Sequence, residues 1–355
     1  MVLEQAEVLA RNVGPHEGGA QADEVDGRLR RPQLIGDALD REAEESMDAP
    51  TALRIKDELV DVAGGMVRAG MKSSGRPPRL YHFTDCQGLV NILRSHSLWA
   101  SLATGLSDDS EVRYGVDRAT GLLEDAPRID RSFRERIQHY LDPKNAFTKK
   151  PFEFDAYVIS FCANAARSVH WLHYGRSGTG CAIGLDASTL VEKPFELAPV
   201  LYDENAQDKF LTSIVEAVWQ CATKYGIDRR NSSASTVLFD VAAHSTAAHI
   251  WMAAPMLKSP AFSNEEEWRL ITYDVRNHDR QRHSDEVPIE TRFRVVAGRI
   301  VPYLQYTLAQ LPVTEIILGA SAPMAVGDPA LKVLLRETVG SKSVEITKST
   351  VTVRP

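Results

Sequence analysis

Aromatic side chains are missing from the first 80 residues of this chain, and the first one is Tyr81. A segment without aromatic residues has little apolar surface from which to build a core. Residues 1–50 also carry 12 acidic and 5 basic side chains, a balance that equals the net charge of −7 of the whole chain. We therefore expect residues 1–50 to form a disordered, acidic leader that could bind a protein partner.

Long apolar runs are also absent. No run of 18 apolar residues occurs, so we expect no membrane span. The first 12 residues contain acids and no apolar stretch, which does not fit a secretory signal. The four cysteines, Cys86, Cys162, Cys181 and Cys221, have no C-x-x-C spacing. This usage is typical of free thiols in a reducing cytosol, so we expect a cytoplasmic protein.

An excess of positive charge is lacking as well. Beyond residue 50 the chain has 36 acidic and 36 Lys and Arg side chains, which gives no electrostatic indication of nucleic-acid binding. Neither a G-x-S-x-G motif nor a P-loop is present. The glycine-rich turn at 175–180 follows an expected helix instead of preceding one, so it is not a dinucleotide-binding fingerprint.

The most informative stretch is 157–186. Its β-branched and aromatic start predicts a strand over 157–162, and a second apolar run predicts a strand over 181–185. Between them we expect a short helix over 167–174 that carries His170, Trp171, His173 and Tyr174. Trp171 and Tyr174 are three residues apart and should share a face. Either this face contacts a planar ligand beside His82, or the two rings are core residues.

The remaining patterns predict the domain organisation. Apolar residues at helical spacing predict a helix over 51–72, which packs on the body or binds a partner, and a linker follows at 73–78. The folded body is expected to span 79–355. Its strands and helices alternate without a regular βα order, which favours an α+β fold with a mixed or antiparallel central sheet and flanking helices.

An ordered set of motifs across 79–355 resembles the bacterial family DUF2971, whose members have no assigned activity. The matching segments are YHFT at 81–84, LWAS at 98–101, SDDSE at 107–111, ISFC at 159–162, HWLHY at 170–174, GCAIGLD at 180–186, EEWRL at 266–270, VTEIILG at 313–319 and ITKS at 346–349. The loop at 107–111 departs from the N-D-P-x-E pattern of the family.

A second resemblance supplies a mechanism. The chain is similar to ADP-ribosyltransferases of the His-Tyr-Glu class, because His82, Tyr174 (or Trp171) and Glu267 follow in that order. This resemblance implies an ADP-ribosyltransferase-like fold, NAD as a substrate and an unknown acceptor. The implied catalytic residues are Glu267, His82 and Tyr174, and the implied NAD-binding residues are His82, Thr84, Trp171, Tyr174, Arg176 and Arg269.

The three residue types suit that chemistry. Cleavage of the nicotinamide–ribose bond produces a cationic sugar, which a fixed carboxylate such as Glu267 stabilises. His82 could hydrogen-bond a ribose hydroxyl, an aromatic ring could stack on nicotinamide, and Arg176 or Arg269 could meet the pyrophosphate. The plainer alternatives are a buried strand histidine at 82, a surface acid at 267 and an ion-pairing arginine at 269.

Other constellations are weaker. Glu265 and Glu267 form an E-x-E pair, but three successive acids make such a pair unspecific. His170 and His173 lack both i,i+4 spacing and a third ligand, so we expect no metal site. Three functions stay open: an NAD-consuming transferase or glycohydrolase of the defence or toxin type; a non-catalytic sensing or interaction module; and a metal-dependent hydrolase or nuclease that uses the acids Asp108, Asp109 and Glu111.

Overall fold

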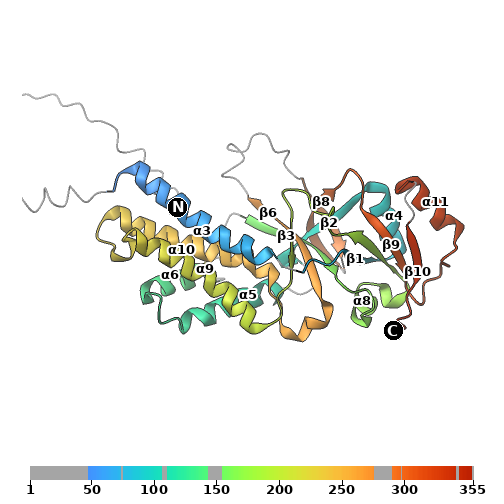
Figure 1. Ribbon diagram of the computed structural model, residues 1–355, viewed down its shortest axis with the longest axis horizontal. Helices are drawn as coiled ribbons and strands as arrows, with labels where there is room; N and C mark the ends of the chain where they lie inside the picture. The colour runs from blue at the N-terminus through green and yellow to red at the C-terminus, as the bar shows by residue number, and fades with distance from the viewer. Residues whose placement is uncertain are drawn as a thin grey trace, which may run out of the picture.

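The computed structural model describes residues 47–72, 75–105, 110–142, 154–275, 290–296, 298–340 and 344–353. It has a helical layer at one end and a β-sheet with smaller helices at the other (Figure 1). The expected leader lies almost entirely outside the described residues, as do Asp108 and Asp109. In the described part, no helix combines the length and the apolar character that a membrane crossing requires.

The helical layer consists of α3 (Ala49–Met71), α5 (Ser110–Glu124), α6 (Arg131–Leu141), α9 (Glu204–Lys224) and α10 (Ser233–Ala253). Polar side chains cap the starts of several of these helices; for example, Asp203 accepts from the backbone N–H of Ala206, and Ser232 forms a capping box with Ser235. Helix α10 is buried on several sides because it packs against α3, α5, α6 and α9.

Helix α3 is part of this layer and not an appendage. Its residues Ile55, Leu59, Ala63 and Val67 recur every four positions and are buried in the same core as α9 and α10. A Cβ added at Gly70 would lie 2.3 Å from the ring of Phe210 on α9, so the glycine permits close packing of the two helices. The expected domain limits at 51–78 and 79–355 stay a prediction that limited proteolysis can test.

The described strands form one mixed, mostly antiparallel sheet, which confirms the α+β expectation. Strand β3 (Phe154–Cys162) joins the parts of the sheet, and we call it the stem. Strand β6 (Glu267–Val275) pairs with all nine β3 residues. Strand β5 (Glu196–Pro199) pairs with the far side of β6. The β9–β10 pair is parallel, whereas the other strand pairs described are antiparallel.

The sheet forks at β3. Because β6 occupies one hydrogen-bonding edge of β3, strands β1 (Arg79–Thr84) and β2 (Ser97–Leu102) share the other edge. Tyr81 of β1 pairs with Cys162, and Ser101 of β2 pairs with Val158. The fork therefore opens beside 159–161. Each of these two strands then leads into a separate wing of the sheet.

One wing continues from β1 through β4 (Cys181–Asp186) and β9 (Val313–Leu318) to β10 (Glu345–Lys348). The other continues from β2 through β8 (Arg299–Thr307) to β7 (Thr291–Val296). Three smaller helices accompany the sheet: α4 (Cys86–Ser95), α8 (Ser168–His173) and α11 (Pro329–Thr338). In Figure 1, β9, β10 and α11 lie at the end opposite the helical layer.

Alternation along β3 separates two cores. Val158 belongs to the core shared with the helical layer, whereas Tyr157, Ile159 and Phe161 belong to a second core that includes residues of α4 and α11. Ser160 has the same parity as Val158, so it faces the helical side of the sheet. Glu267 and Arg269 share this side, because they pair with Cys162 and Ser160, whereas His82 pairs with Ile183 of the second core and faces the opposite side.

Candidate functional site

Ser160 marks the point where solvent reaches the stem of the sheet. It is exposed, although its β3 neighbours Ile159 and Phe161 are buried. Interior strands of a covered sheet are normally apolar throughout. An exposed serine in such a strand therefore indicates a gap in the covering layer, and polar side chains from several strands gather around it.

His82 of β1 lies at the fork. Its Nδ1 is 3.0 Å from the carbonyl oxygen of Ser160, and its ring meets Phe161 edge-on at 5.8 Å between centroids. A carbonyl oxygen only accepts, so Nδ1 must carry the proton and Nε2 becomes an acceptor when the ring is neutral. Burial lowers the pKa of His82, the hydrogen bond to Ser160 opposes this effect, and the charge of Arg294 adds to the lowering. The ring is therefore neutral at neutral pH.

Glu267 begins β6 and is held by two cations. Arg269 donates from Nε to Oε1 at 2.8 Å and from Nη2 to Oε2 at 3.1 Å, and Lys258 Nζ lies 3.3 Å from Oε2. A hydrogen bond from the Ser160 side chain also favours the charged form. Burial raises the pKa of Glu267, but Arg269 and Lys258 outweigh it and lower the pKa to about 2. The carboxylate is thus ionised and fixed.

The E-x-E pair converges on Lys258, which nothing in the sequence had suggested. Lys258 Nζ is 2.6 Å from Oε2 of Glu265 and also contacts Glu267. Arg269 completes the group through its two hydrogen bonds to Glu267, and its Nη1 also donates to the carbonyl oxygen of Pro255 at 2.7 Å. We call Lys258, Glu265, Glu267 and Arg269 the stem cluster; all four are buried, and their formal charges sum to zero.

The ring-rich helix does not present one aromatic face. Trp171 is fully buried, and its Nε1 donates to the carbonyl oxygen of Ala165 at 2.8 Å, as a core residue would. Tyr174 follows the last residue of α8 and is 50% exposed. The two rings therefore do not line a common surface. The structure supports the core alternative for Trp171 and leaves Tyr174 accessible.

His170 is the unexpected member of α8. Its ring stacks on Phe83 at 5.2 Å between centroids, and it is buried. Its Nε2 is buried and has no hydrogen-bond partner within the described part of the chain. Burial lowers the pKa of His170, while the nearby Glu267 and a backbone hydrogen bond to Glu265 oppose the lowering. The ring is thus close to the stem cluster.

Thr84 is the last residue of β1, and Arg176, from the short turn after α8, contacts Asp85, which follows Thr84. Arg176 is exposed and forms an ion pair with Asp85 at 3.0 Å, and Asp85 in turn caps α4 through the backbone N–H of Gly88. A Cβ added at Gly88 would lie 1.9 Å from Oγ1 of Thr84, so the threonine packs closely on the start of α4. Thr84 lies on the same strand as His82, and Arg176 contacts the residue that follows this strand. Within the described part of the chain, no hydrogen bond or ion pair joins either of them to Glu267.

Two further residues extend the polar side of the fork and were missed in the sequence. Ser101 of β2 pairs with Val158 and so faces the same side as Ser160. Arg294 of β7 donates from Nη2 to Oγ of Ser101 at 2.7 Å. The serine in the apolar run at 157–162 was the one available signal, because a polar residue in a buried strand needs a partner.

No potential metal site was found in the described ranges, since no three His, Cys, Asp or Glu side chains group there. Asp108 and Asp109, and the side chain of Glu111, lie outside what is described. The metal-dependent hydrolase therefore stays an untested alternative.

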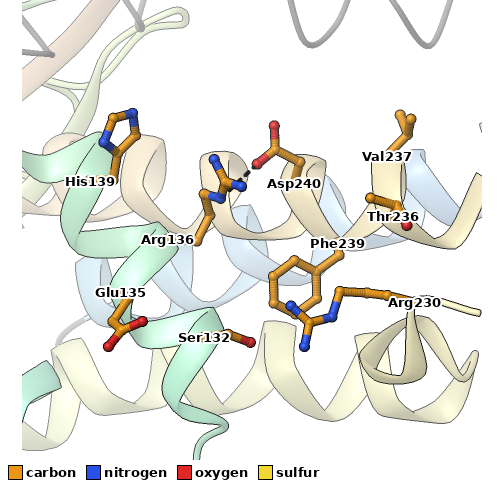
Figure 2. A pocket seen from close by; sticks show the side chains of 9 residues that line it. All are labelled: Ser132, Glu135, Arg136, His139, Arg230, Thr236, Val237, Phe239 and Asp240. Carbon is orange, nitrogen blue, oxygen red and sulfur yellow. Dashed lines mark ion pairs between the residues drawn. The ribbon is translucent and has the colours of Figure 1, made fainter. Parts of the chain in front are cut away.

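A separate pocket of about 550 Å³ lies between α6 and α10 in the helical layer. Arg136 pairs with Asp240 at one side of it, and the guanidinium of Arg230 lies over the ring of Phe239 (Figure 2). None of the residues predicted for the NAD site lines this pocket.

Comparison with known proteins supports one of the two resemblances. Residues 170–270 match the family model described as "Protein of unknown function (DUF2971)". The matched segment runs from α8 into β6 and includes Tyr174, Lys258 and Glu267, but not His82. No curated protein and no solved structure matches the chain. Over residues 170–270, the chain is therefore similar to DUF2971, a family whose description carries no activity.

Proposed function

We propose that the fork of the sheet binds NAD and that the protein cleaves its nicotinamide–ribose bond, as an ADP-ribosyltransferase or NAD glycohydrolase. One observation carries this proposal: His82 and Glu267, which lie 185 positions apart in the sequence, both hydrogen-bond to Ser160. His82 contacts the backbone carbonyl of Ser160 and Glu267 contacts its side chain, and Ser160 is the only exposed residue of β3 from 157 to 162.

The reaction breaks the bond between ribose C1′ and the nicotinamide nitrogen. The bonding electron pair leaves with nicotinamide and neutralises its ring nitrogen, while positive charge develops on the sugar. The Glu267 carboxylate, ionised and fixed, stabilises this charge. Water or an acceptor hydroxyl or amine then bonds to C1′ and releases its proton to solvent, whereas an acceptor carboxylate bonds to C1′ without loss of a proton. His82 Nε2, an acceptor in the neutral ring, receives a ribose hydroxyl.

A non-catalytic binding module is the second candidate, and the stem cluster favours it. Arg269, Lys258 and Ser160 all contact the Glu267 carboxylate. These partners fix the carboxylate but also neutralise much of its charge. If that neutralisation dominates, the fork would bind NAD without cleaving it.

The test is the release of nicotinamide from NAD by the full-length protein, with water and with a panel of acceptors. The informative variant is His82→Asn, because the asparagine amide nitrogen can still donate to the Ser160 carbonyl while the Nε2 acceptor is lost. We expect a rate loss on the order of 10²–10³, typical for one preorganised contact. The control is Glu266→Gln, which removes only a partly exposed ion pair with Arg167.

The outcomes separate the candidates. NAD binding without nicotinamide release under any acceptor condition would favour the binding module. A protein that does not bind NAD at all would eliminate both candidates. Equal activity of His82→Asn and the wild type would retain the reaction but remove His82 from the site.

A further inference from the structure

Arg294 is a half-buried arginine that no carboxylate of the described residues pairs with. It donates to Ser101, and its guanidinium carbon lies 5.5 Å from the centroid of the Trp99 ring. No Asp or Glu of the described ranges forms an ion pair with it, and its Nε is buried without a hydrogen-bond partner there. A guanidinium has five N–H donors. Several donors of Arg294 are thus available to a ligand.

Three other arginines with buried or partly buried side chains differ in this respect. Arg79 pairs with Glu315 at 2.5 Å, Arg118 pairs with Asp208 at 2.6 Å, and Arg269 pairs with Glu267. At Arg294, burial lowers the pKa of the guanidinium, and no carboxylate of the described residues offsets the lost hydration. A bound anion would remove that penalty.

The neighbours of Arg294 suit a nucleotide. Trp99 is 40% exposed and stacks on Tyr303 at 4.5 Å between centroids, which gives a rigid aromatic wall next to the charge. Ser101 Oγ accepts a hydrogen bond from Arg294, so the Ser101 O–H can still donate a hydrogen bond to a second oxygen. The residues Trp99, Ser101, Arg294 and Tyr303 form what we call the wing cluster.

The wing cluster faces the same side of the sheet as Ser160. Ser101 pairs with Val158 and with Tyr303, and residues directly opposite each other in antiparallel strands face one side. The charge of Arg294 also reaches His82, because it contributes to the lowered pKa of that ring. A ligand at the wing cluster would therefore extend toward the fork.

We propose that Arg294 and Ser101 bind a phosphate group of a nucleoside diphosphate, with Trp99 as the aromatic wall beside it. This inference deepens the proposed function, on which it rests only for the identity of the complete ligand: with NAD, the bound group is the pyrophosphate. The role suggested for Arg269 in the sequence passes to Arg294, since Arg269 is engaged by Glu267 and Pro255.

The experiment measures the affinity of the full-length protein for ADP and for adenosine by calorimetry. ADP carries the phosphates but no bond that the proposed reaction cleaves. Arg294→Gln should weaken ADP binding by about tenfold or more, because a charge-assisted, forked contact is lost. Adenosine binding should not change. Arg294→Lys keeps the charge but loses the forked guanidinium, so its ADP affinity should lie between those of the wild type and Arg294→Gln.

The matched control is Arg292→Gln on the same strand. Arg292 is exposed and already contacts Glu290 and Gln305, so its loss should change ADP affinity by less than about threefold. Melting temperatures of all variants check folding, and Arg294→Lys replaces Arg294→Gln if the latter unfolds.

Equal ADP affinity of wild type and Arg294→Gln would overturn the inference, and so would a wild type that binds no ADP up to about 1 mM. Arg294-dependent ADP binding without nicotinamide release from NAD would support the inference while the proposed catalysis fails. Nicotinamide release with an unchanged KM for NAD in Arg294→Gln would support catalysis and remove the phosphate subsite.

Discussion

The stem cluster and the wing cluster each contain an arginine on the same side of one sheet, yet their charges are balanced differently. Arg269 is 2% exposed and donates twice to Glu267. Arg294 is half-buried and donates to a neutral hydroxyl. The charges of the stem cluster are thus balanced by its own members, whereas no carboxylate of the described residues balances the positive charge of the wing cluster.

This difference separates two uses of a buried charge. Removing an ion from water costs free energy that only a well-placed partner returns. Where the partner belongs to the chain, as at Arg269, the charge fixes the structure. Where no described residue supplies the partner, as at Arg294, the cost is borne in the free protein and is recovered when an anion binds. The predictions below test whether the two clusters divide in this way.

The largest expected effect concerns the same substitution at both arginines. Arg269→Gln leaves the buried Glu267 with Lys258 as its remaining cation, so we expect a loss of about 3–5 kcal/mol in the free energy of unfolding. Arg294→Gln removes one hydrogen bond and a cation–π contact, so we expect about 1 kcal/mol or less. Urea denaturation of both variants measures the difference. Equal losses would mean that the two clusters are alike in kind.

A second prediction concerns acid. The pKa of Glu267 falls from 4.5 to about 2 on folding, so its ionised form contributes stability above pH 4.5 that is lost as the pH falls toward 2. The shift corresponds to about 3 kcal/mol. Glu267→Gln should therefore lower stability at pH 7 and flatten the loss of stability between pH 4.5 and 2. Unfolding free energies at several pH values test this.

The control for the acid prediction is Glu266→Gln. Its ion pair with Arg167 is partly exposed, so stability should change by less than about 1 kcal/mol at any pH. An acid profile of Glu267→Gln that matches the wild type would show that Glu267 is not the group that titrates.

Much of the architecture could be predicted because its signals are local. The apolar runs and glycines of 157–186 predicted two strands around a short helix, and β3, α8 and β4 confirm them. The α+β class followed from the irregular order of strands and helices. The helix over 51–72 was also correct, although the sequence could not show whether it packs on the body, because that depends on partners such as Phe210.

The site could be predicted only in part. His82 and Glu267 were chosen by resemblance to a motif, and the structure adds that both contact Ser160. The prediction that Trp171 and Tyr174 share one exposed face was wrong, since the short helix α8 buries Trp171 and ends before Tyr174. Arg294 could not be found in this way, because it meets Ser101 across 193 positions. Such contacts arise only when distant strands pair.

The smallest expected effect links the two clusters through His82. Burial is the main cause of its lowered pKa, and Arg294 contributes through its positive charge. Arg294→Gln should therefore raise the pKa of His82, but by less than about one unit, since burial persists. Proton NMR titration of the His82 ring measures the shift, with Arg292→Gln as the control.

Because a lowered histidine pKa costs stability as the pH falls below the unfolded value of about 6.5, Arg294→Gln should also reduce that acid sensitivity slightly. ADP bound to the wild type should raise the His82 pKa in the same direction, since its phosphates neutralise Arg294. If ADP binds but leaves the His82 titration unchanged, its phosphates do not lie at Arg294. The difference between the two clusters would then have no role in ADP binding.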